Sequence, residues 1–108
     1  FCSIIAGDIQ SNKVAETDLS YAFRDISPAA PTHVLVIPKR HVPNVVALAE
    51  ASAEELQDVF QLAGVVAAQE QLTDGYRMVA NTGLVAQQTV FHAHVHVLGG
   101  RDFTWPPG

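Results

Sequence analysis

The strongest pattern of apolar and polar positions lies over residues 53–72 and has the period of a helix. Apolar side chains recur there at intervals of three and four residues and form a single face: Leu56, Val59, Phe60, Ala63 and Ala67. Ser52 and Glu55 have the spacing of a capping box, in which each side chain bonds the free backbone N–H of the other residue. The pattern predicts a long helix that ends before Asp74-Gly75, with Gly64 allowing close packing against a sheet.

Shorter apolar stretches, several of them rich in β-branched residues, predict strands. The densest covers residues 33–38 and is short enough for a buried strand. Pro28 and Pro31 before it lack the N–H that a sheet ladder needs, so a loop is expected there. The predicted strands cover residues 14–18, 19–24, 33–38, 76–81 and 89–98, with a short helix over 45–51 and a turn at Gly7-Asp8 after an apolar stretch over 3–6.

Antiparallel strands combined with one long and one short helix predict an α+β fold, built on an antiparallel sheet of about five strands. The 108 residues suffice for one hydrophobic core and not for two, so a single domain over residues 1–108 is expected. Apolar residues make up 48% of the chain and charged residues 16%, as in folded rather than disordered proteins.

The charge of the chain narrows the range of partners. A net charge of -5 argues against a nucleic-acid surface, which needs basic residues to neutralise phosphates, and against an anionic membrane surface. A small phosphate ligand remains compatible, because its site needs only local donors. Cys2 is the one cysteine, so no internal disulfide is expected, and no apolar run approaches the ~20 residues of a membrane span. We therefore expect a cytoplasmic protein.

The candidate chemistry centres on residues 92–96, where histidine alternates with apolar residues. Successive side chains of a strand point to opposite faces, so His92, His94 and His96 are expected to form a row on one face, about 6.5–7 Å apart. Three of the chain's five histidines fall within this short run, so chance is a poor explanation for it.

Three interpretations of this row are open. Neutral imidazoles bind zinc, and alternating histidines on a strand supply zinc sites in some enzymes. An imidazole also attacks phosphorus when neutral and leaves when protonated, so it supports a covalent nucleotidyl intermediate. The third interpretation is a solvated sheet face without chemistry. Gln88 and Thr89, just before the row, supply neutral donors, and these favour phosphorus chemistry because such transfer depends on positioning and charge stabilisation.

Three separated stretches resemble one known family. Residues 88–101, with the row of histidines, resemble the signature of the histidine-triad (HIT) superfamily, residues 25–41 its second diagnostic stretch, and residues 75–81 a third. The ending from Trp105 to Gly108, with Gly-Gly-Arg after the histidines, is similar to the Hint branch rather than to the Fhit or galactose-1-phosphate uridylyltransferase branches. The resemblance covers nearly the whole chain and implies a HIT-like fold and a purine nucleoside phosphoramidase activity.

The resemblance implies a role for each histidine. His94 matches the nucleophile, which would attack the α-phosphorus of a purine nucleoside 5'-phosphoramidate, expel the amine, and form a nucleotidyl-histidine that water hydrolyses to the nucleoside monophosphate. His92 and His96 match the flanking members, which hydrogen-bond the phosphate or the nucleophile and set protonation. His33 matches a fourth histidine near the leaving group, although its own position at the start of a strand indicates only a surface residue.

The same resemblance implies a nucleotide-binding set. Asp25 matches the carboxylate that accepts the ribose hydroxyls, although a turn carboxylate is an equal interpretation of its local sequence. A dinucleoside polyphosphate hydrolase of Fhit type and a non-catalytic nucleotide-binding scaffold are the alternatives. The other implied members are Phe1, Ile4, Phe23 and Ile26 for the base, Asn81, Gln88 and Thr89 for the phosphate, and Trp105 as an aromatic residue that reaches the site of a second subunit in a homodimer.

The loop before the row of histidines departs from the Hint pattern at two positions. Gln87 stands where the Hint pattern has a glycine whose N–H approaches the phosphate, and Thr89 replaces a serine.

No cofactor is required for the implied reaction. Some bacterial relatives hold structural zinc through two cysteines and two histidines, which Cys2, His41 and His92 match in part. A structural site prefers four ligands and only three are visible, so Cys2 as a core residue is the preferred interpretation.

Overall fold

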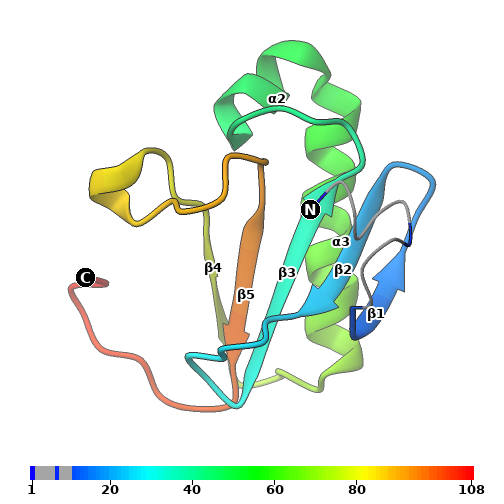
Figure 1. Ribbon diagram of the computed structural model, residues 1–108. Coiled ribbons are helices and arrows are strands. Elements are labelled where there is room, and N and C mark those ends of the chain that lie inside the picture. The colour runs from blue at the N-terminus through cyan, green and yellow to red at the C-terminus, as the bar shows by residue number, and fades with distance from the viewer. Residues whose placement is uncertain (2–6, 8–10) are drawn as a thin grey trace.

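The computed structural model describes residues 1, 7 and 11–108. Five antiparallel strands form one sheet in the order β1-β2-β3-β5-β4, and helix α3 lies across one face of it (Figure 1). The predicted α+β fold is confirmed, while the stretch over 3–6 and the turn residue Asp8 lie outside the described residues. The elements are β1 (Lys13–Glu16), β2 (Ser20–Arg24), β3 (Thr32–Pro38), α2 (Val45–Ala51), α3 (Ala53–Gln69), β4 (Tyr76–Val79), the 3-10 helix η1 (Leu84–Ala86) and β5 (Val95–Gly99).

The two faces of the sheet differ in what they bury. The face under α3 forms the apolar core with both helices: Ala22, Val34, Val36, Val95 and Val97 meet Leu48, Val59, Leu62, Ala63 and Val66. The opposite face carries a smaller cluster of Tyr21, Phe23, Leu35 and Ile37, against which Phe1 packs. Because side chains alternate along a strand and Leu35 is paired with His96, this second face also carries His33 and His96.

Helix α3 ends earlier than predicted. Its last residue is Gln69 rather than residue 72, because Gln71 adopts a left-handed conformation (φ 60°) and the Leu72 N–H turns back to the Ala67 carbonyl oxygen at 3.0 Å. Leu72 then packs against Gly99, where a Cβ atom would lie only 2.6 Å from Leu72 Cδ1. The glycine at the end of β5 therefore makes room for the side chain that follows the helix.

The buried face of α3 is also rotated relative to the predicted one. Leu62 and Val66 are buried, whereas Phe60 is 40% exposed and Leu56 packs only partly buried against the core. The prediction that Gly64 packs closely on the sheet is wrong, because a Cβ atom there would meet nothing within 4 Å. The side of the helix that carries Gly64 is therefore open.

The start of α3 contains half of the predicted capping box. The Ser52 hydroxyl accepts the Glu55 N–H at 3.2 Å, as predicted. The reciprocal bond is replaced by two others: the Ser52 N–H donates to the Leu48 carbonyl oxygen at 2.8 Å, and the Glu55 carboxylate pairs with Arg40 at 2.6 Å. Ser52 is therefore both the C-cap of α2 and the N-cap of α3.

Strand β5 begins at Val95 rather than at residue 89. The chain before it is not part of the sheet ladder, because the Ala93 N–H donates to the Val42 carbonyl oxygen at 2.7 Å. Only His96 of the predicted row therefore lies in a strand, and the other two histidines lie in the irregular segment that precedes it.

The remaining predictions agree with the structure to within a few residues. The β1–β2 hairpin, β3 and α2 lie where the pattern placed them, while β4 ends at Val79 rather than at residue 81. The tail over residues 105–108 has no regular structure. In the part of the chain that the structure describes, no helix is both long and apolar enough to cross a membrane.

Gln88 fastens the irregular chain between β4 and β5. Its side chain is 1% exposed. Its Oε1 accepts the Gly83 N–H at 2.9 Å, and its Nε2 donates to the carbonyl oxygens of Pro43 and Val90 at 2.6 and 3.0 Å. This buried amide joins both sides of the loop to the segment that leads into α2.

Replacing Gln88 with alanine is expected to lower the free energy of unfolding by about 2–4 kcal/mol, because buried backbone groups lose their partners. Urea denaturation followed by circular dichroism measures the change. The matched control is Gln87→Ala, whose exposed side chain is expected to matter by no more than about 0.5 kcal/mol. Equal stability of the two variants would contradict this role of Gln88.

Candidate active site

All five histidines of the chain gather on or beside the sheet face that lies opposite α3. The predicted row is therefore present, although only one of its members lies in a strand, and it is extended by two histidines from the segment 33–41. The ring contacts between centroids are His33–His96 at 5.1 Å, His94–His96 at 5.0 Å and His41–His92 at 5.1 Å.

The ring contacts divide the histidines into two groups, one of His33, His94 and His96 and one of His41 and His92, and Phe1 lies between them. Its ring packs edge-on against His94 and His92, with centroid distances of 5.2 and 5.6 Å, and against Phe23 at 5.6 Å. Two residues predicted to contact the base, Phe1 and Phe23, therefore lie together, and Phe1 touches the predicted nucleophile.

His94 presents one ring nitrogen with an available lone pair. The side chain is 8% exposed, and its Nδ1 lies 2.7 Å from the carbonyl oxygen of His92. A carbonyl oxygen can only accept, so Nδ1 carries the proton and the neutral ring keeps its lone pair on Nε2. This tautomer, assigned from the hydrogen bond, suits His94 Nε2 to nucleophilic attack.

His92 is oriented by a second backbone carbonyl. It is 1% exposed, and its Nε2 donates to the Pro38 carbonyl oxygen at 2.8 Å. Its Nδ1 therefore accepts, and His41 Nδ1 lies 3.1 Å from that atom. Burial lowers the pKa of His92, the carbonyl of Pro38 opposes the shift, and the charges of His41 and His94 add to it. His92 is consequently neutral at pH 7.

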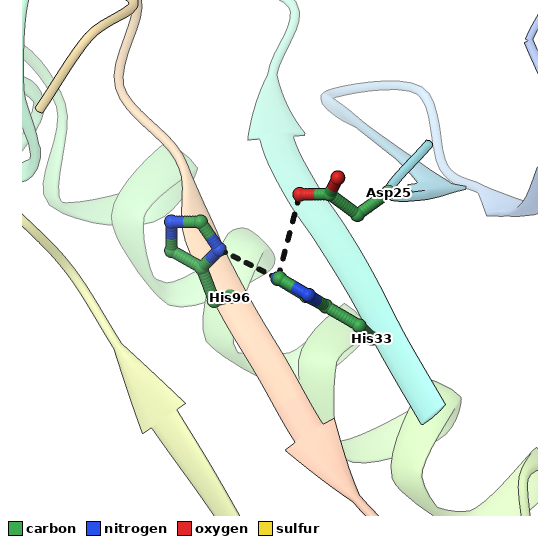
Figure 2. Close-up of side chains that lie close together, drawn as sticks. All are labelled: Asp25, His33 and His96. Carbon is green, nitrogen blue, oxygen red and sulfur yellow. Dashed lines mark hydrogen bonds and ion pairs between the residues drawn. The ribbon is translucent and has the colours of Figure 1, made fainter. Parts of the chain in front are cut away.

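Asp25, His33 and His96 form the cluster drawn in Figure 2. His33 Nε2 lies 2.8 Å from His96 Nδ1 and 3.5 Å from Asp25 Oδ2. Burial lowers the pKa of His96 to about 4, helped by the charges of His94 and His33 and opposed by Asp25. Burial also lowers the pKa of His33, against the attraction of Asp25. Both rings are neutral at pH 7, so they share a hydrogen bond and not a charge.

The predicted nucleotide-binding residues do not all lie at this cluster. Asp25 accepts the Ser27 N–H through Oδ1 at 2.8 Å and has Oδ2 near His33. Ile26 beside it is 98% exposed, so it lines no apolar slot formed by the described part of this chain. Trp105 is 83% exposed on the tail that leaves the end of β5 (Figure 1).

The predicted phosphate loop uses most of its polar groups for its own structure. The buried Gln88 amide has three partners, so it is not free to donate to a ligand. Gln87 has a φ of 69°, in the left-handed region that favours glycine, and its N–H donates to the Leu84 carbonyl oxygen at 3.0 Å. The half-buried Asn81 and the exposed Thr89 keep side chains that no hydrogen bond in the described structure occupies.

Besides the His92 carbonyl that bonds His94, two further backbone groups outside the predicted set help to shape the site. The Ala29 N–H donates to His33 Nδ1 at 3.0 Å, and the Pro38 carbonyl accepts from His92. Nearly every residue carries such groups, so no sequence signal distinguishes these two.

The cluster in Figure 2 is also the one group of three or more histidine, cysteine or acidic residues, within the described chain, whose donor atoms lie close enough for a metal ion, all within 4.8 Å. The bond from Ala29 argues against that use. A backbone N–H can only donate, so the neutral His33 carries its proton on Nε2, the atom that faces the metal position. The cluster therefore suits hydrogen bonding better than metal ligation.

The sequence and the fold match known proteins over nearly their whole length. The HIT domain model matches residues 6–103. An uncharacterised HIT-like protein of Synechococcus elongatus is 50% identical over 111 residues, which cover 100% of this chain and 95% of that protein. A 14 kDa zinc-binding protein of Zea mays is 47% identical over 110 residues, covering 100% and 86%. The crystal structure of a HIT family hydrolase from Legionella pneumophila has a TM-score of 0.95 at 43% identity, covering 100% of this chain and 97% of that one.

The lowered pKa values predict that stability falls as the pH drops from about 6.5 to 4. In the unfolded chain histidines take up protons near pH 6.5, whereas in the folded protein the pKa of His33 is lowered and that of His96 is about 4. The unfolded state therefore binds more protons in this window, and each site lowers the free energy of unfolding by at most about 1.4 kcal/mol per pH unit. Urea unfolding at several pH values measures the slope. His96→Asn is expected to reduce it, and an unchanged slope would contradict the assignment.

Proposed function

Since this chain belongs to the HIT domain family, and a solved relative is a HIT family hydrolase, we propose that it hydrolyses purine nucleoside 5'-phosphoramidates at the P–N bond. His94 Nε2 attacks the α-phosphorus, the P–N bond breaks, and the amine leaves with the bonding electron pair and takes a proton from solvent. Water then attacks the same phosphorus, loses a proton to solvent and breaks the bond to His94, which releases the nucleoside monophosphate.

The orientation of His94 carries this proposal. With Nδ1–H bonded to the His92 carbonyl oxygen at 2.7 Å, the lone pair on Nε2 is available to form the bond to phosphorus. The ring becomes an imidazolium once that bond forms, and the same carbonyl stabilises its positive charge. An imidazolium is a good leaving group, so one hydrogen bond assists both steps.

The neighbouring residues supply binding and charge stabilisation. His96, with its ring centroid 5.0 Å from that of His94, donates a hydrogen bond to a phosphoryl oxygen. The carboxylate of Asp25 accepts from the two ribose hydroxyls. The remaining assignments are Phe1 and Phe23 for the purine, and Asn81 and Thr89 for the phosphate.

His94→Ala is expected to lower kcat for AMP release from adenosine 5'-phosphoramidate by at least about 10³-fold, because the covalent intermediate can no longer form. Chromatography of released AMP measures turnover, and calorimetric binding of AMP to the variant is the control for an intact pocket. Unchanged turnover would exclude this mechanism.

A substrate comparison separates the two alternative functions. Faster turnover of diadenosine polyphosphates than of phosphoramidates would indicate a dinucleoside polyphosphate hydrolase. Tight AMP binding by the wild type without turnover of any phosphoramidate would indicate a nucleotide-binding scaffold.

We further propose that the chain acts as a homodimer joined at β4. This strand pairs with β5 on one side only and forms an edge of the described sheet. Tyr76 and Met78 on it are 41% and 42% exposed, and Val65 of α3 is 48% exposed. Gly64, which is open and lines a shallow hollow with Tyr76, would allow a second subunit to approach closely. The exposed Trp105 suits a contact with that subunit.

Met78→Glu is expected to convert the protein from twice the chain mass to a single chain mass, because the charge opposes burial at the joined edges. Light scattering coupled to size-exclusion chromatography measures the mass. Val85→Glu is the control, since Val85 is 100% exposed on η1 and lies outside the proposed interface. A monomeric wild type would refute the dimer.

A structural zinc ion is a second proposal, supported by the Zea mays relative that is called a zinc-binding protein. His41 and His92 have their Nδ1 atoms 3.1 Å apart, and His92 gives its other N–H to the Pro38 carbonyl, as zinc-ligating histidines commonly do. Cys2, the third residue of this set, lies outside the described residues, as does Ile4 of the nucleotide-binding set.

Elemental analysis of purified protein is expected to find about one zinc ion per chain in the wild type and in Asp25→Asn, and much less in Cys2→Ser with His41→Asn. The comparison locates the ion, because each variant removes ligands from only one of the two clusters. Zinc retained by the double variant and lost from Asp25→Asn would place it at the cluster of Figure 2 instead. Protein that binds no zinc from supplemented medium would refute the proposal.

A further inference from the structure

The loop between β2 and β3 fixes the position of the proton on His33. The backbone N–H of Ala29 points at His33 Nδ1 from 3.0 Å. Because an N–H can only donate, Nδ1 must be the unprotonated nitrogen of the neutral ring. His33 is 8% exposed, so water has little access to supply an alternative partner.

The same constraint passes from His33 to His96. The single proton of neutral His33 lies on Nε2, which is 2.8 Å from His96 Nδ1 and therefore donates to it. His96 Nδ1 must accept, so the proton of neutral His96 lies on its own Nε2. In Figure 2 this second nitrogen of His96 lies on the side of the ring away from His33.

We infer that the Ala29 backbone amide, acting through His33, is a positioning group that makes His96 Nε2 a hydrogen-bond donor in the active site. The role of that donor rests on the proposed function: it stabilises the charge that develops on a phosphoryl oxygen while His94 attacks. His96 itself transfers no proton in this step and remains a neutral donor.

The opposite tautomer would serve the reaction poorly. A proton on His33 Nδ1 would face the Ala29 N–H, so two donors would meet in a buried site. His33 Nε2 would then accept from His96 Nδ1, and His96 Nε2 would hold a lone pair. An unprotonated Nε2 would repel a phosphoryl oxygen, whereas a protonated Nε2 donates a hydrogen bond to it. The amide of Ala29 excludes this arrangement before the substrate binds.

Two pairs of variants test the inference. Ala29→Pro deletes the backbone N–H, whereas Ala29→Gly retains it. His33→Leu removes the donor to His96, whereas His33→Gln keeps an amide N–H that can reach the same nitrogen. If Ala29→Pro does not fold, the His33 pair of variants tests the effect of His33 on His96, and the wild-type spectrum tests the effect of Ala29 on His33.

Long-range proton–nitrogen correlation NMR of the ring nitrogens gives the primary readout, without substrate. Wild type, Ala29→Gly and His33→Gln are expected to show His96 protonated on Nε2. Ala29→Pro and His33→Leu are expected to show a mixture of the two tautomers. A wild-type His33 or His96 protonated on Nδ1 would overturn the inference, and so would an unmixed Nε2–H His96 in His33→Leu.

Kinetics on adenosine 5'-phosphoramidate give the second readout. Ala29→Pro and His33→Leu are expected to lose at least about tenfold in kcat with little change in KM, because the donor acts on the transition state. His33→Gln is expected to recover most of the loss relative to His33→Leu. Equal kcat in these two variants would remove the catalytic part of the inference. The predicted tautomers without turnover of any phosphoramidate would refute the proposed function and leave the positioning role intact.

Discussion

The antiparallel pairing of β3 with β5 is the constraint on which the site depends. Its register sets Leu35 opposite His96, so that His33 and His96 lie on the same face of the sheet, away from the core under α3. A slip of one residue would turn every side chain of one strand to the other face. The valines buried on the α3 side, Val34 and Val97 among them, oppose such a slip. Burial of apolar side chains on one face therefore positions the imidazoles on the other.

Backbone groups then decide what each imidazole can do. The carbonyl oxygen of His92 accepts the Nδ1–H of His94, the carbonyl oxygen of Pro38 accepts the Nε2–H of His92, and the Ala29 N–H donates to the unprotonated Nδ1 of His33. These contacts lie where water is largely excluded, so they are strong and hard to replace. A set of chemically identical rings thus acquires distinct donor and acceptor atoms through contacts with peptide groups.

Several elements follow from local pattern alone, and the differences have tertiary causes. Strand β3 follows from the density of its β-branched residues, and the start of α3 follows from the Ser52 cap. The pattern starts β5 too early, because the alternation of histidine and apolar residues begins before the chain joins the sheet, where the Ala93 N–H bonds the Val42 carbonyl oxygen instead. The period of α3 identifies an apolar stripe, but the exposure of Phe60 depends on which elements pack against the helix.

The sequence by itself determined the α+β class, the row of histidines and the resemblance to the HIT superfamily, because these reside in short-range periodicity and in motif order. Only the tertiary structure decided which ring nitrogen carries a proton. It also showed that the Gln88 amide, expected to bind the phosphate, bonds the backbone around its own loop instead, and that Ile26 is exposed. Contacts such as His33 with His96 join residues far apart in the chain. Packing brings such residues together, and peptide groups decide which ring nitrogen donates. No local pattern of side chains encodes the packing or the position of those peptide groups.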